Sequence, residues 1–122
     1  MKELTAKEEE IMNYFWQHGK LFVKDILEFY DDPKPHFNTI STIVRGLEEK
    51  GYLGHEAFGK TYRYHAVVSA SEMGLKSMKS IVSRFFKNSY LGVVSSFVRD
   101  EDISIDELKR LIDEVENNKK QE

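Results

Sequence analysis

Residues 38–47 of the chain read Asn38-Thr39-Ile40-Ser41-Thr42-Ile43-Val44-Arg45-Gly46-Leu47. Apolar side chains recur in this run at positions i, i+3, i+4 and i+7, which predicts a helix with one buried stripe. The opposite face carries short hydroxyls, one amide and one guanidinium, with no glutamate before Glu48. Such a face suits hydrogen bonds to phosphates and to base edges. The alternative is an ordinary amphipathic helix.

The segments around this helix predict a small α/β unit. A Thr5-x-x-Glu8 capping box opens a helix that ends at Gly19, and residues 21–22 read as a short extended segment. A second helix is expected over residues 23–30, and a breaker with both prolines follows over residues 31–35. The central helix then runs from Asn38 to Lys50. Two strands, residues 52–58 and 61–67, flank Gly59-Lys60 and predict a β-hairpin.

The order helix, helix, helix, hairpin is that of a winged helix-turn-helix, in which the third helix enters a DNA groove and the hairpin reaches adjacent backbone. We therefore expect a mainly α fold with a small β-hairpin wing, and we assign residues 1–70 to a winged-helix DNA-binding domain.

Residues 71–122 are expected to form a helical dimerisation domain of three helices. The helices span about residues 71–87, 90–98 and 105–116, and residues 117–122 are expected to be a frayed polar tail. The helical region, residues 71–116, has fewer than 50 residues, and a segment of that size with such apolar faces rarely buries them alone, whereas two copies can. The alternative is that the segment folds back on its own winged helix. The residues expected at the dimer interface are Phe85, Phe86, Leu91, Val94, Phe97, Leu108, Leu111, Ile112 and Val115.

Composition excludes several functional classes. The chain has no Cys, which excludes a disulfide framework and a thiolate nucleophile, and its four His residues lack the spacing of a metal site. No nucleophile motif or Gly-rich loop suggests an enzyme, and no cofactor is expected. Without an 18-residue apolar run or a signal-peptide h-region, we expect a cytoplasmic protein that does not insert into a membrane. Because the net charge is −3, any DNA-binding face requires that positive side chains gather on one surface and negative ones on another.

The chain resembles the penicillinase and methicillin-resistance repressors, the BlaI/MecI family of winged-helix regulators. The matching motifs run in order along nearly the whole chain: Leu4-Thr5, Ile11-Met12, Trp16, Thr39-Ile40, Lys50-Gly51-Tyr52-Leu53, Tyr62-Arg63-Tyr64, Phe97-Val98 and Asp106-Glu107-Leu108. The resemblance implies a homodimeric repressor that binds an inverted-repeat operator in double-stranded DNA. It further implies a link to β-lactam resistance and release through cleavage of the dimerisation arm by a membrane sensor metalloprotease.

Carried onto this sequence, the cleaved bond is Ser96–Phe97. Ser96 stands where the family has Asn, so the cleavage or its specificity differs from the family pattern. Some relatives sense copper through cysteines near the C-terminus, and the absence of Cys here excludes that branch.

The expected DNA contacts lie on the central helix and the wing. Arg45 can bridge guanine O6 and N7 or clamp a phosphate, with an ion pair to Glu48 or Glu49 as the alternative. Thr39 and Thr42 offer hydroxyls one turn apart. Ser41 stands where the family pattern often carries Arg, so base preference is expected to differ.

Three further residues complete the expected DNA contacts. Asn38 stands at a position where the family pattern frequently has Lys. The alternative role of Asn38 is that of the helix N-cap. Lys60 at the hairpin tip and Arg63 beyond it are expected to contact phosphates, although charged turns are often simply solvated.

Two rival functions stay open from the sequence. The acidic net charge is compatible with a winged-helix protein–protein adaptor whose third helix binds a protein. The other rival is a repressor that senses a ligand in a pocket between arm and wing and is not controlled by proteolysis.

Overall fold

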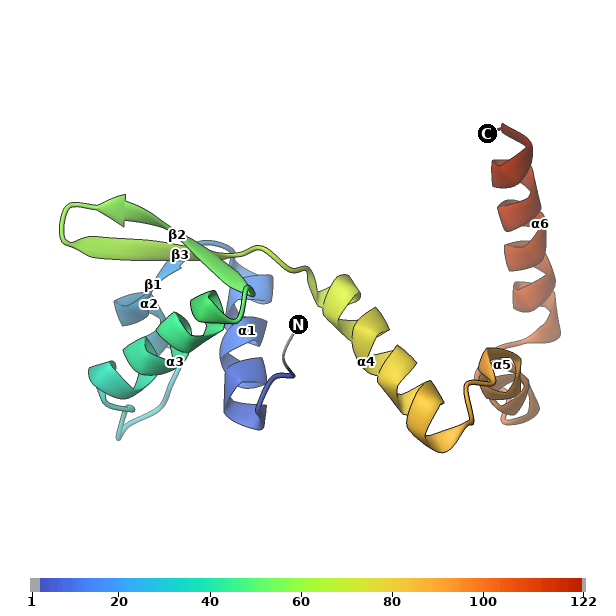
Figure 1. The fold of residues 1–122 in the computed structure, drawn as a ribbon, viewed down its shortest axis with the longest axis horizontal. Helices are drawn as coiled ribbons and strands as arrows, with labels where there is room; N and C mark the ends of the chain where they lie inside the picture. The colour runs from blue at the N-terminus through green and yellow to red at the C-terminus, as the bar shows by residue number, and fades with distance from the viewer. Residues whose placement is uncertain (1–2, 122) are drawn as a thin grey trace. The chain divides into compact units, whose positions relative to one another are not determined.

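The computed structural model describes residues 3–121, which fall into two compact units that divide between Gly74 and Leu75. Six helices and three strands make up this part of the chain (Figure 1). In order they are α1 (Ala6–His18), β1 (Leu21–Phe22), α2 (Val23–Leu27), α3 (Phe37–Glu49), β2 (Leu53–Phe58), β3 (Thr61–Ala66), α4 (Ala70–Phe85), α5 (Tyr90–Arg99) and α6 (Ile105–Gln121). The first unit is a winged helix-turn-helix, as the sequence predicts.

The ends of α1 follow the sequence signals. The Thr5 hydroxyl accepts a hydrogen bond from the Glu8 amide at 3.2 Å, and the Glu8 carboxylate accepts one from the Thr5 amide at 2.9 Å. Both amides belong to the group that a helix start leaves without an intrahelical acceptor. At the other end Gly19 takes φ 83°, where a Cβ would be strained, and its amide donates to the Phe15 carbonyl. The predicted capping box and helix stop are both confirmed.

The sheet is a three-stranded antiparallel sheet in the order β1-β3-β2. In the hairpin Phe58 pairs with Thr61 and Leu53 with Ala66, so Gly59-Lys60 forms the predicted two-residue turn. Gly59 has φ 61°, which the tight turn requires. The extended pair Leu21–Phe22 adds the third strand beside β3. The wing is therefore joined to the chain that leads into α2.

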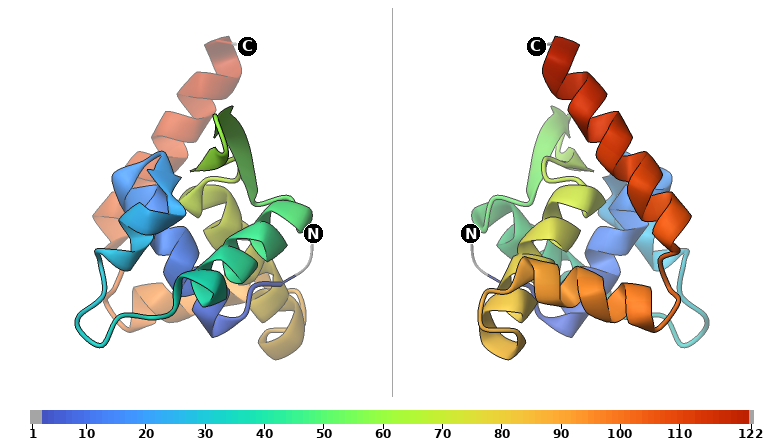
Figure 2. Two further views of the ribbon diagram at one scale, coloured as in Figure 1. Left: turned by 90° about the vertical axis from the view of Figure 1, so that its left-hand side faces the viewer. Right: turned by 90° about the vertical axis from the view of Figure 1, so that its right-hand side faces the viewer.

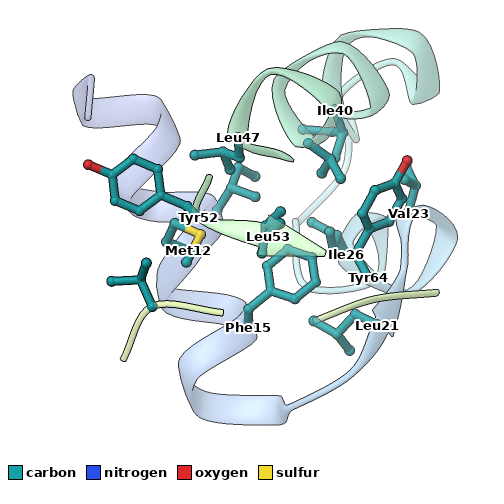
Figure 3. Packing of buried hydrophobic residues seen from close by; sticks show 13 residues of the cluster. Met12, Phe15, Leu21, Val23, Ile26, Ile40, Leu47, Tyr52, Leu53 and Tyr64 are labelled. Atoms are coloured by element: carbon teal, nitrogen blue, oxygen red, sulfur yellow. The ribbon is translucent and has the colours of Figure 1, made fainter. Parts of the chain in front are cut away.

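The apolar stripe of α3 lies at the centre of the core. Ile40, Val44 and Leu47 are completely buried, and they share one cluster with apolar side chains of α1, α2 and the sheet (Figure 3). Beside this cluster, the indole N–H of Trp16 in α1 donates to the Val68 carbonyl at 2.9 Å, where the chain leaves the hairpin. The packing fixes which face of α3 points outward.

Two sequence predictions about this unit are wrong. The second helix ends at Leu27 instead of Tyr30, because the amides of Phe29 and Tyr30 bond to carbonyls three residues back. The Lys34 ammonium also donates to the carbonyls of Leu27 and Tyr30. Asn38 is not the N-cap of α3.

The N-cap of α3 is His36, whose Nδ1 accepts the amide of Asn38 at 3.1 Å. The helix therefore begins one residue earlier than predicted, and the Asn38 side chain is left exposed on its first turn.

The second unit consists of the rest of α4, together with α5 and α6. Lys87 and Asn88 have φ 51° and 63°, and this left-handed pair separates α4 from α5 at the predicted break. Ser89 caps α5, and a Ser104–Glu107 box opens α6. The prediction of a frayed tail from residue 117 is wrong up to Gln121, because α6 continues to that residue; Glu122 lies outside the described residues. Among residues 3–121, no helix combines the length and apolar character needed to cross a membrane.

Candidate nucleic-acid interface

The outward face of α3 carries polar residues along its length. Asn38, Thr42, Arg45 and Glu49 follow each other at helical spacing, and all four are exposed. Thr39 is also exposed but lies on a neighbouring edge of the helix. The helix and the hairpin belong to the same unit and can be followed together in the left view of Figure 2. Glu49 places a negative charge at the C-terminal end of this face, whereas Asn38, Thr42 and Arg45 before it carry no carboxylate.

The guanidinium of Arg45 is available on this surface. Its Nε donates to the Ser41 carbonyl one turn back at 3.4 Å, which leaves both Nη groups free of helix contacts. No ion pair with Glu48 or Glu49, the alternative considered from the sequence, occurs within the described residues. The free edge of the guanidinium has the fork geometry that guanine and phosphate require.

The hydroxyl of Thr42 is already engaged. It donates its proton to the Asn38 carbonyl at 2.8 Å. In this rotamer Thr42 offers DNA its methyl group and an acceptor lone pair, not a donor for phosphate. A contact with a thymine methyl therefore suits this side chain best.

A brace between α3 and the wing, which the sequence analysis missed, fixes their relative position. The Glu48 carboxylate on the last turn of α3 hydrogen-bonds Nδ1 of His55 in β2. The ring of His55 stacks on Tyr62 of β3, with centroids 4.2 Å apart and planes 20° apart. His55 pairs with Tyr64 across the two strands, and the sequence predicts the strands but not which residues face each other. The brace also gives one carboxylate near the interface a partner.

The two predicted wing cations differ in their surroundings. Lys60 is exposed in the hairpin turn. Arg63 is half-buried, with its guanidinium 4.7 Å from the Phe58 ring centroid and 3.6 Å from the Glu56 carboxylate. The Lys20 ammonium, helped by Arg63, holds the pKa of Glu56 below its usual range. Lys60 is therefore open to solvent, whereas Arg63 packs against the other strand of the hairpin.

Three of the seven predicted DNA-contact residues line one cavity. Ser41, Arg45 and Lys60 surround a hollow of about 390 Å³ between α3 and the wing. Asn38, Thr39, Thr42 and Arg63 lie outside this lining. The cavity also includes Lys24 and Phe37, which the sequence analysis did not select. In the sequence, Lys24 lies on the polar side of a helix whose apolar residues are Val23, Ile26 and Leu27, but no pattern indicates that the wing approaches it.

The residues predicted at the dimer interface are spread over α4, α5 and α6 of the second unit. The exposed fractions are 83% for Leu91, 71% for Phe85 and 52% for Leu111. Ile112, Val115, Phe97 and Phe86 are also exposed, while Val94 and Leu108 are half-buried. Isolated soluble chains rarely leave so many large apolar side chains in water.

The bond between Ser96 and Phe97 lies inside α5. The Ser96 carbonyl accepts the Asp100 amide at 3.0 Å, and the Ser96 hydroxyl donates to the Gly92 carbonyl at 3.0 Å. This peptide group is therefore held in regular helix.

Comparison with known proteins gives a consistent result. A family model described as "Penicillinase repressor" matches residues 4–117. The methicillin resistance regulatory protein MecI of Staphylococcus aureus (strain N315) is 29% identical over 112 residues, covering 89% of each chain. The penicillinase repressor of Bacillus licheniformis is 24% identical over 127 residues, covering 98% of this chain and 96% of its own.

Among solved structures, a MepR mutant from a multidrug-resistant S. aureus clinical isolate aligns with a TM-score of 0.44 and 16% identity. The alignment covers 97% of this chain and 78% of that one. This likeness is too loose to assign a function, which rests on the relatives in sequence.

Proposed function

Since the chain belongs to the penicillinase repressor family, and is therefore a winged-helix transcriptional repressor and not an enzyme, we propose that it binds an inverted-repeat operator in double-stranded DNA as a homodimer. Each protomer places the face of α3 from Asn38 to Arg45 in a major groove and the turn of the wing over the adjacent backbone.

The observation that carries this proposal is the face of α3 around Arg45. An exposed guanidinium without a carboxylate partner in the described residues lies beside an amide, a hydroxyl and a methyl group. These are the groups that read base edges. Ser41 and Lys60 lie around the same hollow as Arg45 and extend the surface towards the backbone.

The exposed apolar side chains of the second unit support dimerisation through that unit. A twofold interface would place the same surface of both copies together, so each apolar position contributes twice, once from each copy. Dimerisation also sets the half-site spacing. Losing the arm then weakens operator binding through lost bivalency while each winged helix keeps its own contacts.

We propose that repression ends through cleavage of the Ser96–Phe97 bond by a membrane sensor metalloprotease. Cleavage there separates Phe97, Leu108, Leu111, Ile112 and Val115 from the DNA-binding unit. Because the bond lies in α5, the helix must open locally before a protease can bind the segment in extended form. Mass spectrometry of the repressor incubated with the sensor tests the position of the cut, and a cut elsewhere would move the site.

The names of two relatives support a target among antibiotic-resistance genes. The test of the whole proposal is fluorescence anisotropy with DNA from the region upstream of the gene and with a scrambled duplex, over a salt series. Binding should prefer the native duplex and fall steeply between low and moderate salt. Equal, weak binding to both duplexes would favour the protein–protein adaptor.

The same assay tests the role of Arg45. Arg45→Ala should cost roughly 1–3 kcal/mol of specific binding, because it removes a bidentate base contact. Arg110→Ala, a matched change in α6, should leave the affinity unchanged. An undiminished affinity in Arg45→Ala would move the recognition role to another part of the helix.

A further inference from the structure

The cavity between α3 and the wing has the make-up of a small-molecule site. Its volume of about 390 Å³ falls in the range of ligand pockets, which measure roughly 300–1,000 Å³. Four aromatic side chains line it, and two of them, Phe37 and Tyr62, are 48% and 47% exposed. The aromatic residues are Phe22, Phe37, Tyr62 and Tyr64. Flat rings on several walls favour a planar ligand.

The charged side chains around the cavity are all positive. Lys24 enters from α2, Arg45 from α3 and Lys60 from the hairpin turn, and no carboxylate belongs to the lining. None of the three cations forms an ion pair with a described residue. The Lys24 ammonium lies 5.6 Å from the Phe22 ring centroid, so a cation and an aromatic surface already meet at this wall. The cavity therefore complements a negative charge attached to an apolar body.

We infer that this cavity binds a small planar aromatic carboxylate. The ring system lies among the aromatic side chains, and the carboxylate lies among Lys24, Arg45 and Lys60. A DNA phosphate could satisfy the cations but brings no apolar surface for the rings, which distinguishes the two occupants. The hydroxyls of Ser41 and Thr61 in the lining offer further hydrogen bonds.

The site has a consequence for regulation, and this part rests on the proposed function. Arg45 and Lys60 are also the proposed contacts to base edges and backbone. A carboxylate that occupies them neutralises the surface that DNA needs, so the ligand and the operator exclude each other. The protein would then respond to a metabolite of this class without any cleavage of the arm.

The first experiment uses naphthoate as a fluorescent probe with the full-length protein and no DNA. We expect saturable binding with a roughly millimolar or tighter dissociation constant, as a ligand of this size allows. The uncharged isostere naphthamide should bind at least about tenfold more weakly. Failure to saturate below about 10 mM, or equal binding of the two compounds, would overturn the site.

Variants of Lys24 test the charge argument away from the proposed DNA contacts. Lys24→Gln should weaken naphthoate binding about tenfold, whereas Lys24→Arg should retain it. Lys79→Gln in α4, a matched loss of one exposed lysine, should bind like the wild type. Both Lys24 variants keep an exposed polar side chain, so circular dichroism should show a folded protein. Unchanged binding by Lys24→Gln would refute the assignment.

The second experiment titrates operator DNA in the presence of naphthoate. Exclusive binding raises the apparent dissociation constant for DNA by the factor 1 + [L]/Kd, which is about tenfold at nine times the naphthoate Kd. Simultaneous binding of both would overturn the regulatory part alone. Naphthoate binding in a protein that binds no operator would instead refute the proposed function and leave the site standing, so the two failures are distinguishable.

Discussion

Replacing Leu91 by Ala tests the dimerisation arm most directly. Leu91 is 83% exposed in the protomer, the largest exposed fraction among the large apolar side chains of the described residues. Full burial of a leucine side chain contributes about 1.5–3 kcal/mol, and a twofold interface contains the position twice. If a partner covers Leu91, the substitution should therefore cost about 3–6 kcal/mol of dimer stability. The dimer dissociation constant then rises by roughly two to four orders of magnitude.

The protomer itself should tolerate this substitution. Removing a side chain that is already in water leaves no cavity, and Ala is at least as good a helix former as Leu. Val93, two residues further along α5, is only 8% exposed and serves as the contrast. Val93→Ala should lower the stability of the second unit by roughly 1–3 kcal/mol, since it removes buried methyl groups. The pair separates loss of association from loss of folding.

Sedimentation velocity over a concentration series measures the dimer constant, and circular dichroism in urea measures folding. Leu91→Ala should dissociate at concentrations where the wild type is dimeric, with unchanged helix content. Its operator affinity should fall with the dimer, while the salt dependence per protomer stays the same. A wild-type dimer constant in Leu91→Ala would refute burial of this surface against a second copy.

Three further substitutions test the first unit. Ile40→Ala should destabilise it by about 2–5 kcal/mol in urea unfolding, because Ile40 is fully buried at the centre of the core. Trp16→Phe should cost about 0.5–1.5 kcal/mol by the same measurement, because the Val68 carbonyl loses its donor. Burial raises the pKa of the Glu8 carboxyl, but hydrogen bonds from the Lys50 ammonium at 2.7 Å and from Thr5 outweigh it and hold the pKa below the usual 4.5. The stabilisation is thus complete above pH 4.5 and is lost as the pH falls through the lowered pKa, so Glu8→Gln should cost roughly 1–3 kcal/mol at pH 7 and progressively less as the pH is lowered from 4.5.

The winged helix could be predicted because its signals are local. The stripe of Ile40, Val44 and Leu47 at helical spacing identifies both a helix and its buried face, and packing leaves no other face for contacts with DNA. Caps such as Thr5-x-x-Glu8 and the Gly59-Lys60 turn mark where elements begin and reverse. Each of these signals lies within a few residues, so no tertiary information is needed.

The features that sequence reasoning missed depend on which groups meet in the folded chain or on an unusual capping side chain. The Lys34 ammonium reaches carbonyls four and seven residues back, where α2 ends early. His36 caps α3 with a ring nitrogen, which is not among the usual capping groups. Lys24 joins the cavity only because the turn of the wing returns to the start of α2. The spacing of residue types along the chain does not indicate any of these three contacts.

The pattern of ion pairs explains how a chain with a net charge of −3 can present a surface suited to DNA. Near the interface, Glu48 bonds to His55 and Glu56 is held by Lys20, whereas the described residues provide no carboxylate partner for Arg45. Positive potential is therefore concentrated on one small surface instead of following from the total charge. A surface this small reaches few phosphates in each protomer, which makes a single copy a weak binder. Under the proposed function, tight binding then comes from two linked copies, so an acidic winged helix of this kind should depend on its arm more than a basic one.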